Sequence, residues 1–312
     1  FPHAPAIELA LAQWDATRDP AWRLIVVQTL LAMGRGGIYD QLGGGFHRYS
    51  VDADWIVPHF EKMSAENALL LKNYTQAYRA TGIDFFREVA QGTLDFILNV
   101  LADNEHGGFF ASQDADNGDR DDGSYWTWSL AEITDILTAE EIKVAIRYFG
   151  VLPQGQQPGM NRNVLHIAAT PAEIARELQL SEDEVVHRLR NAERKLRVVR
   201  DRRKAPLVDR NKYASWNAML ISACLEAGAL LDRKDATEFA LRSVETMLHD
   251  DYEPDHGIYH ALYAGAGARL PGYFEDQAYM AQALLDASAV GGERKYRDTA
   301  CHLLDLCIER YW

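Results

Sequence analysis

Apolar positions recur at helical spacing along most of the chain, and this pattern predicts helices that follow one another in pairs. The pattern breaks at glycine-rich stretches, of which Gly36-Gly37 and Gly43-Gly44-Gly45 are the densest. Shorter helices and one charged helix fill the middle of the chain. The expected helices span residues 7–17, 22–33, 64–80, 84–101, 130–137, 139–149, 182–204, 213–231, 236–248, 276–290 and 295–310.

One part of this pattern is repeated. Residues 66–112 align without a gap on residues 216–262, which places His106-Gly107 on His256-Gly257. Helix pairs that repeat in this way cannot bury their apolar faces alone and must stack on their neighbours. We therefore expect an all-α fold, an α/α toroid with short β-hairpins at the end where the glycine corners converge.

Two further stretches extend the repeat. Tyr273-Phe274-Glu275 is expected to start a helix as His59-Phe60-Glu61 does. Around residues 106–128, a glycine-aromatic run and the run Tyr125-Trp126-Thr127-Trp128 predict a hairpin with a wide loop.

A single toroid domain is expected over residues 1–312, with residues 129–204 as an insertion of shorter helices. The pattern contains eight long helices, whereas a ring of six hairpins needs twelve. Either the shorter helices help to close the ring, or the sequence is a piece of a longer domain. An apolar edge near Leu284, Leu304 and Ile308 should then be covered by those helices, by a missing segment or by a second chain.

The amino-acid composition limits the classes of binding partner that the chain can have. The chain has 46 acidic and 32 basic residues, a formal charge of −14, which argues against nucleic acid and anionic membranes as partners. Its three cysteines have no metal-binding spacing and suit a reducing compartment, so we expect a cytoplasmic protein. No apolar run reaches the length of a membrane span. The sequence predicts neither a metal nor a cofactor.

The first candidate site follows the glycine corners. His59 and Glu61 precede a predicted helix, where a histidine and a carboxylate can perform acid/base catalysis. The alternative is that Glu61 only favours the helix dipole and His59 only binds backbone. His47 and Arg48 lie in the same polar stretch and are candidates for binding a substrate.

The second candidate is Asp114 with Asp116, two carboxylates that point the same way if they end a strand. Asp119, Asp121 and Asp122 are interpreted as a solvated acidic loop. We expect Glu61 and Asp114 to face each other across a groove. An epimerase would instead use two histidines, for which His59 and His260 are the candidates.

Aromatic and polar residues at the predicted loops and helix starts form the third candidate, because sugar rings stack on aromatic faces. Some of these aromatic side chains are expected to serve packing alone. The predicted substrate-binding residues of this kind are Tyr39, Trp55, Trp126, Trp216, Asn217, Tyr273, Glu275 and Asp276.

The strings GGIYDQLGGGFHRYSVD, WIVPHFEKM, GGFFASQDAD and SWNAML together resemble the YyaL/spermatogenesis-associated family. That resemblance implies a helical domain similar to six-hairpin glycosidases and N-acylglucosamine 2-epimerases, joined to an N-terminal thioredoxin-like domain. We expect the present sequence to lack the thioredoxin-like domain and to stop before the helical domain ends. The resemblance implies no settled reaction.

Two functions therefore remain open. The first is a carbohydrate-active enzyme that uses general acid/base catalysis, either an epimerase or isomerase or a glycoside hydrolase. The second is a non-catalytic module that binds a glycan or a protein for a thioredoxin-like domain. In both cases the ligand is a small molecule, a glycan or a protein client rather than nucleic acid.

Overall fold

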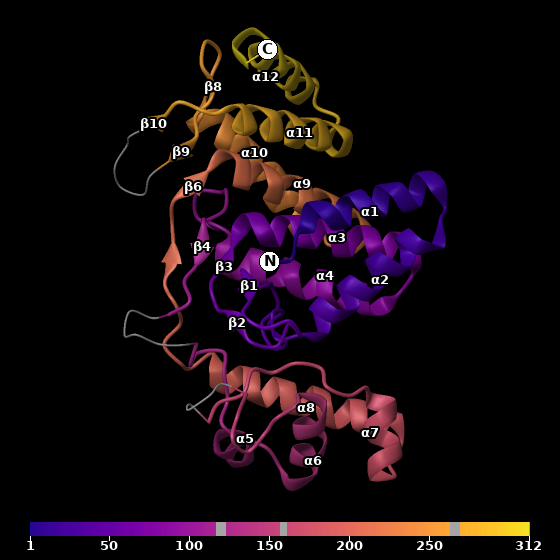
Figure 1. Cartoon of the computed structure of the whole chain (residues 1–312). Coiled ribbons are helices and arrows are strands. Elements are labelled where there is room, and N and C mark those ends of the chain that lie inside the picture. The colour runs from indigo at the N-terminus through magenta and orange to yellow at the C-terminus, as the bar shows by residue number, and fades with distance from the viewer. Residues whose placement is uncertain (117–122, 157–160, 263–268, 312) are drawn as a thin grey trace. The chain divides into compact units, whose positions relative to one another are not determined.

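The computed structural model describes residues 1–116, 123–156, 161–262 and 269–311 (Figure 1). The chain divides into two compact units, and each is described by itself. Unit 1 comprises residues 1–2, 24–61 and 114–207, and unit 2 comprises residues 3–23, 62–113 and 208–312. The chain thus passes from one unit to the other several times. The expectation of one domain with an insertion at 129–204 stays a prediction.

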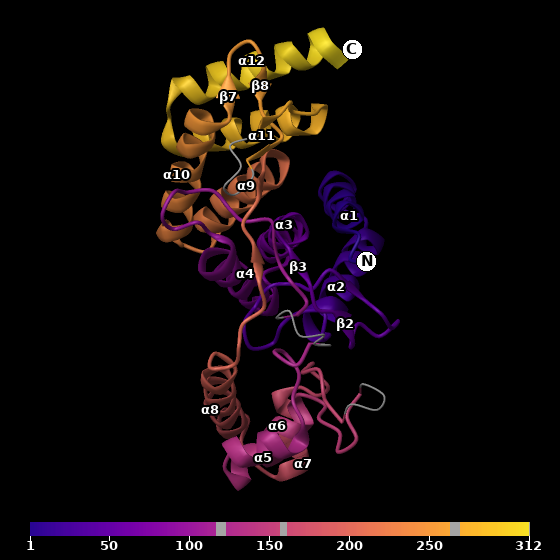
Figure 2. The ribbon, with the colours of Figure 1, turned by 90° about the vertical axis from the view of Figure 1, so that its left-hand side faces the viewer.

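Unit 2 is a double layer of helices. The inner layer is α3 (Ser64–Thr81), α9 (Ala214–Leu230) and α11 (Phe274–Gly291), in which α3 packs on α9 and α9 on α11. The outer layer is α4 (Asp84–Phe96), α10 (Lys234–Asp250) and α12 (Arg294–Tyr311), each packed on the inner helix that precedes it. Figure 2 shows α4 and α10 on one side of α3 and α9. A π-helical turn, Ile97–Leu101, continues α4, and α1 (Ala4–Thr17) packs on α3.

Two three-stranded antiparallel sheets precede the inner helices. One contains β3 (Lys62–Met63), β4 (Ser112–Gln113) and β5 (Val208–Asp209), and the other contains β6 (Lys212–Tyr213), β9 (Ala261–Leu262) and β10 (Arg269–Leu270). A separate hairpin joins β7 (Tyr252–Glu253) to β8 (Gly257–Ile258). Each strand that leads into α3 or α9 therefore pairs with a strand that follows the next glycine corner.

An amide side chain in the first turn of an inner helix fixes the preceding glycine corner. Asn217 of α9 accepts from the N–H of Phe109 (2.6 Å) and donates to its carbonyl (3.0 Å). Gln277 of α11 makes the same pair of bonds with Ile258, at 2.8 and 2.7 Å. We call this arrangement the amide lock. Gly108 and Gly257, which precede the two locked residues, are both in the left-handed region, where glycine is the least strained residue.

The amide lock corrects the sequence repeat at two places. Gly257-Ile258 corresponds to Gly108-Phe109, so the ungapped alignment is wrong by one residue at the corner, because the first corner has one more residue in its turn. In the corrected repeat, Tyr273, which directly precedes α11, is equivalent to Met63, which directly precedes α3. His59 and Glu61 therefore do not start a helix as Tyr273 and Glu275 do.

Unit 1 holds most of α2 (Pro20–Arg35), a two-stranded ribbon and a group of four helices. The ribbon pairs β1 (Tyr49–Ser50) with β2 (Pro58–His59). The helices are α5 (Leu130–Ile136), α6 (Ala139–Tyr148), α7 (Pro171–Leu178) and α8 (Glu182–Arg200), with α5, α6 and α7 packed on α8 (Figure 1). Trp128, Phe149 and Leu196 are buried in their core.

Two expectations for unit 1 were wrong. The run Tyr125-Trp126-Thr127-Trp128 does not pair with the strand at Ser112: Trp128 bridges to Asn163 instead, and β4 pairs with β3 and β5. The sequence pattern also missed α7. Its signal is a capping box, in which Thr170 and Glu173 bind each other's backbone N–H, with Pro171 at the first helical position.

The predicted apolar edge is only partly confirmed. Leu304 and Ile308 on α12 are exposed, as expected, whereas Leu284 lies fully buried within unit 2. The spacing of apolar residues does not show whether a helix face packs on a neighbouring helix or faces solvent. The sequence pattern therefore could not distinguish the buried Leu284 from the exposed Leu304 and Ile308.

Candidate functional site

The glycine corner of unit 1 brings two backbone segments into contact. A Cβ atom on Gly36 would clash with the carbonyl oxygen of Trp55, and one on Gly37 would clash with that of Ile56. Trp55 itself has a positive φ of 64°, and its carbonyl accepts from Ile38. The glycines are therefore needed for this close approach, and Trp55 takes a strained backbone to complete it.

His47 is enclosed by aromatic side chains. Its Nδ1 is 2.8 Å from the carbonyl oxygen of Phe60, and its ring meets the rings of Phe60 and Trp126 edge-on at 5.2 Å. Phe60 and Trp126 are themselves stacked. His47 is almost fully buried, and so is Trp126. This cluster packs the corner, as does Tyr39, whose ring lies against that of Phe46.

Glu61 is paired with Arg48 by two contacts. The Arg48 guanidinium donates to the Glu61 carboxylate at 2.9 Å, and the backbone N–H of Arg48 donates to the carbonyl of Glu61 at 2.8 Å. His59 stacks on Tyr49 with ring centres 5.0 Å apart, and its Nδ1 is buried without a hydrogen-bond partner. Both residues thus lie on or beside the β1–β2 ribbon rather than at a helix start.

Asp114 is exposed to solvent and bonds to the N–H of the next residue, Ala115. Asp116 is half-buried. Asp119, Asp121 and Asp122 lie outside the described residues. The roles predicted for Glu61, His59, Asp114 and Asp116 stay predictions.

A buried ion pair that the sequence pattern did not single out anchors the corner of unit 1. The Arg200 guanidinium at the end of α8 donates to both carboxylate oxygens of Asp40, at 2.9 and 2.8 Å. Burial lowers the pKa of Arg200, but the charges of Asp40, Tyr125 and Asp201 and the hydrogen bond to Asp40 together raise it by more, so the pKa lies above its usual value. Asp40 also accepts hydrogen bonds from the backbone N–H groups of Leu42 and Gly43. Its carboxylate therefore binds both the backbone of its own loop and the Arg200 side chain of α8.

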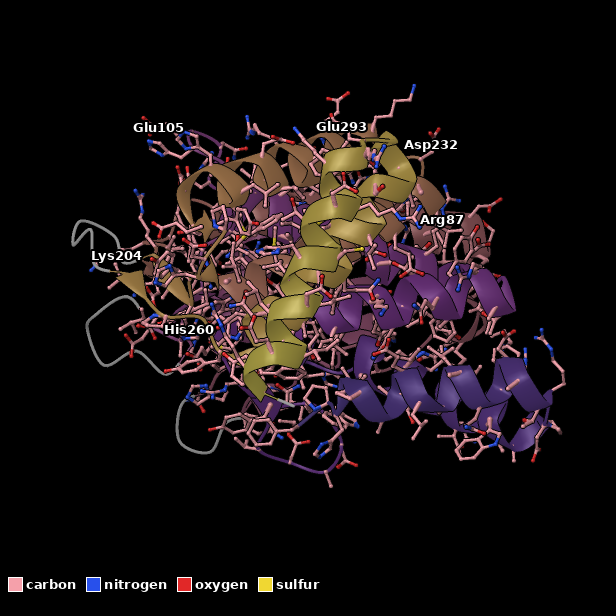
Figure 3. The ribbon with its side chains drawn as sticks, turned by 90° about the horizontal axis from the view of Figure 1, so that it is seen from above. Arg87, Glu105, Lys204, Asp232, His260 and Glu293 are labelled. Carbon is pink, nitrogen blue, oxygen red and sulfur yellow. The ribbon has the colours of Figure 1, made fainter. Side chains whose placement is uncertain are left out.

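In unit 2, a histidine and a buried carboxylate meet beside the start of α11. Nδ1 of His260 lies 2.9 Å from Oδ2 of Asp276, and Asp276 is fully buried. The same carboxylate accepts from the backbone N–H of Tyr273 (2.8 Å) and of Ser215 (3.1 Å). Figure 3 shows His260 among the short strands of unit 2.

These contacts determine which nitrogen of His260 is available. Asp276 accepts two backbone N–H groups, and an ionised carboxylate can only accept hydrogen bonds. Nδ1 must therefore carry a hydrogen atom, which leaves Nε2 of the neutral ring as an acceptor. About 18% of the His260 side chain is exposed, so a ligand can reach the ring.

Aromatic rings surround His260. The ring of Tyr273 lies 4.6 Å from it and the ring of Tyr213 lies 5.5 Å from it, while Trp216 contacts Tyr213. Tyr213 was not among the predicted site residues: the pattern placed it as the first residue of the helix expected at 213–231, whereas it ends β6 and directly precedes α9. Glu275 is exposed on the first turn of α11.

The structure thus brings together His260, Asp276, Tyr273 and Trp216 of the predicted residues. Asn217 has a different part. Its amide is engaged by the backbone of Phe109 and Tyr213 and so holds the corner, and its predicted part in binding a substrate stays a prediction.

Within the described ranges, no three His, Cys, Asp or Glu side chains gather in a way that could hold a metal ion. None of the helices in those ranges is long and apolar enough to cross a membrane.

Homologous proteins match this sequence over almost its whole length. Spermatogenesis-associated protein 20 of Homo sapiens is 28% identical over 92% of this chain, and an uncharacterised protein of Caenorhabditis elegans is 27% identical over 93%. The chain spans only 40% of the human protein and 43% of the nematode one. No protein-family profile matches. The resemblance inferred from the motifs is confirmed.

Solved structures show the same fold at low identity. A GH76 α-mannanase of Bacteroides thetaiotaomicron matches 100% of this chain and 61% of its own, with a TM-score of 0.59 and 12% identity. Cellobiose 2-epimerase from Spirochaeta thermophila matches 92% of this chain and 54% of its own, with a TM-score of 0.51 and 16% identity. The expected fold class, a six-hairpin α/α toroid, is confirmed.

Proposed function

We propose that this homologue of spermatogenesis-associated protein 20 is a carbohydrate-active enzyme in which His260 transfers a proton to and from a sugar. The observation that carries the proposal is the hydrogen bond between His260 and Asp276. It fixes the hydrogen on Nδ1 and presents Nε2 as a base. A base that is held in one orientation is more effective than a freely rotating side chain.

The surroundings of His260 suit a sugar. The rings of Tyr213 and Tyr273 flank the imidazole, and Tyr273 is 56% exposed, so it offers a free aromatic face. The apolar face of a pyranose ring packs on such a surface, while its hydroxyl groups remain free to form hydrogen bonds. The fold shared with a sugar epimerase and a mannanase agrees with a sugar ligand.

Epimerisation or isomerisation fits these residues better than hydrolysis. Hydrolysis by two carboxyl groups needs one that stays protonated, which requires burial away from positive charge. Among the candidates, Glu61 is paired with Arg48 and Asp276 accepts three hydrogen bonds, while Asp114 is exposed and Asp116 is only half-buried. A histidine can remove the proton from a carbon beside a carbonyl group, as the open form of a reducing sugar requires.

The test is exchange of sugar hydrogen with solvent. Reducing sugars, among them glucose, mannose, N-acetylglucosamine and cellobiose, are incubated with the protein in D₂O and followed by NMR. We expect deuterium at the carbon next to the carbonyl and appearance of the epimer or isomer. His260→Asn should slow this exchange by about 10²–10⁴-fold, the usual contribution of a positioned base.

His256→Asn is the matched control, because His256 is exposed and lies in the turn between β7 and β8, ahead of the segment that carries His260. It should leave the rate unchanged. Equal exchange in the wild-type protein and in His260→Asn would refute the role of His260. Sugar binding without any exchange would favour the alternative, a non-catalytic binding module.

A further inference from the structure

Unit 2 contains a groove that the proposed reaction does not use. It has a volume of about 690 Å³ and runs along the face of the inner layer that is turned away from α4 and α10. Side chains of α1, α3, α9 and α11 line it, among them Glu8, Lys72, Ser222, Phe274, Tyr279 and Gln282. This volume is typical of ligand pockets, which span about 300–1,000 Å³, and is larger than one sugar ring requires.

One wall of the groove is a single face of α11. Glu275, Ala278, Tyr279 and Gln282 follow the spacing that brings side chains to the same side of a helix. Tyr279 is 39% exposed, and Phe274 at the start of the helix is 54% exposed. The wall therefore combines two aromatic surfaces with polar groups, as a site for a polyhydroxylated ligand requires.

The charges in the groove select against anions. Among the residues that the structure describes, the one cation in its lining is Lys72, which is bonded to Glu8 at 2.7 Å and so is neutralised within the groove. Glu275 adds an exposed carboxylate. A neutral or amino-bearing sugar is compatible with these groups, whereas a uronic acid is repelled by them.

The groove begins where the proposed reaction takes place. Phe274 and Glu275, which line it, lie between Tyr273 and Asp276 in the first turn of α11. Tyr273 packs on His260, and Asp276 binds it. A ligand whose reducing end reaches His260 can therefore extend its other residues along α11.

We propose that this groove binds the non-reducing residues of a neutral or amino-bearing oligosaccharide, so that the substrate is an oligosaccharide rather than a monosaccharide. The proposal rests on the proposed function for the position of the reducing end. Binding in the groove is separate from the reaction and can be measured without it.

The experiment titrates the ¹⁵N-labelled chain with glucose, cellobiose, cellotriose and cellotetraose. Backbone amide shifts are recorded together with the dissociation constant. We expect affinity to increase with chain length and the amides of Ser222, Tyr279 and Gln282 to shift. Tyr279→Ala should weaken cellotetraose binding about tenfold, the effect of removing one aromatic contact, without weakening glucose binding. A tetragalacturonate of equal length should bind more weakly than cellotetraose.

Tyr78→Ala is the control: Tyr78 is a half-buried tyrosine on α3 that does not line the groove. Melting temperatures show whether either variant is misfolded, and Tyr279→Phe, which keeps the ring, should retain the affinity. Affinity that is independent of chain length, or an absence of shifts along α11, overturns the groove proposal even if His260 catalyses exchange on glucose. Length-dependent binding with shifts along α11 supports it even if no exchange occurs.

Discussion

At the scale of single residues, the structural role of each candidate side chain depends on its tertiary contacts. These contacts could not be predicted from the sequence. His47 and His59 lie in the most distinctive motifs, yet His47 is enclosed by Phe60 and Trp126. His260 lies in a plain segment but meets the fully buried Asp276. Both residues of that pair were candidates from the sequence pattern, but their contact was not predicted. A local pattern cannot show a contact across 16 residues of chain.

The residue-scale prediction concerns Asp276. In Asp276→Asn the amide oxygen can still accept a hydrogen bond from one backbone N–H. The NH₂ group, however, would face another hydrogen-bond donor, and the side chain would no longer hold the hydrogen atom on Nδ1 of His260. We expect exchange to slow at least about 100-fold and the free energy of unfolding to fall by about 1–2 kcal/mol, as for a lost helix cap. Exchange rates and urea unfolding measure the two effects.

The exposed Asp298→Asn on α12 serves as the control and should change neither quantity. If Asp276→Asn retained full exchange activity while losing stability, Asp276 would be a helix cap and not a positioning residue for His260.

At the scale of elements, the long helices were predictable and the strands were not. The predicted helix at 64–80 is observed as Ser64–Thr81, because spacing and the Thr81-Gly82 stop are local signals. Each strand that leads into α3 or α9 has two residues and pairs with a partner about 50 residues away, as Lys62 does with Gln113. Such short strands carry no periodicity, so their pairing follows from how the helices stack.

The amide lock yields the prediction at this scale. Asn217→Ala removes the partners of the N–H and the carbonyl of Phe109, both of which lie in a buried corner. We expect the free energy of unfolding to fall by about 2–4 kcal/mol, since an unsatisfied buried polar group costs about 1–3 kcal/mol. Gln277→Ala should have a similar effect at Ile258.

Asn99→Ala is the comparison, because Asn99 is exposed and bonds only to a carbonyl of its own helix. Chemical denaturation of the three variants would decide: equal stability of Asn217→Ala and Asn99→Ala would mean that the lock contributes little.

At the scale of the whole molecule, stretches far apart in the sequence share one compact unit. Unit 1 contains residues 129–204, whose role as an insertion stays a prediction, and it also contains the glycine corner at residues 36–61. The ion pair between Asp40 and Arg200 joins these two stretches across 160 residues. Arg200 was one of many basic residues on a charged helix, and nothing local distinguished it from its exposed neighbours.

Unit 1 should therefore depend on Arg200. Arg200→Ala leaves Asp40 as an uncompensated buried charge, which typically costs about 3–5 kcal/mol. We expect hydrogen exchange followed by mass spectrometry to show faster exchange in residues 36–61 and 182–200, with little change in α9. The exposed Arg202→Ala should behave as the wild-type protein. Uniform acceleration in α9 and unit 1 alike would show that the two units do not unfold separately.

Asp276 has one more consequence. A single carboxylate holds His260 and also binds the backbone at the starts of two inner helices, α9 and α11. Any compound that engages His260 in the native protein must therefore also oppose the melting of those helices. At a hundred times its dissociation constant, such a compound would add about 2.7 kcal/mol to the free energy of unfolding. A library of sugars can thus be screened by heating alone, before the product of any reaction is known.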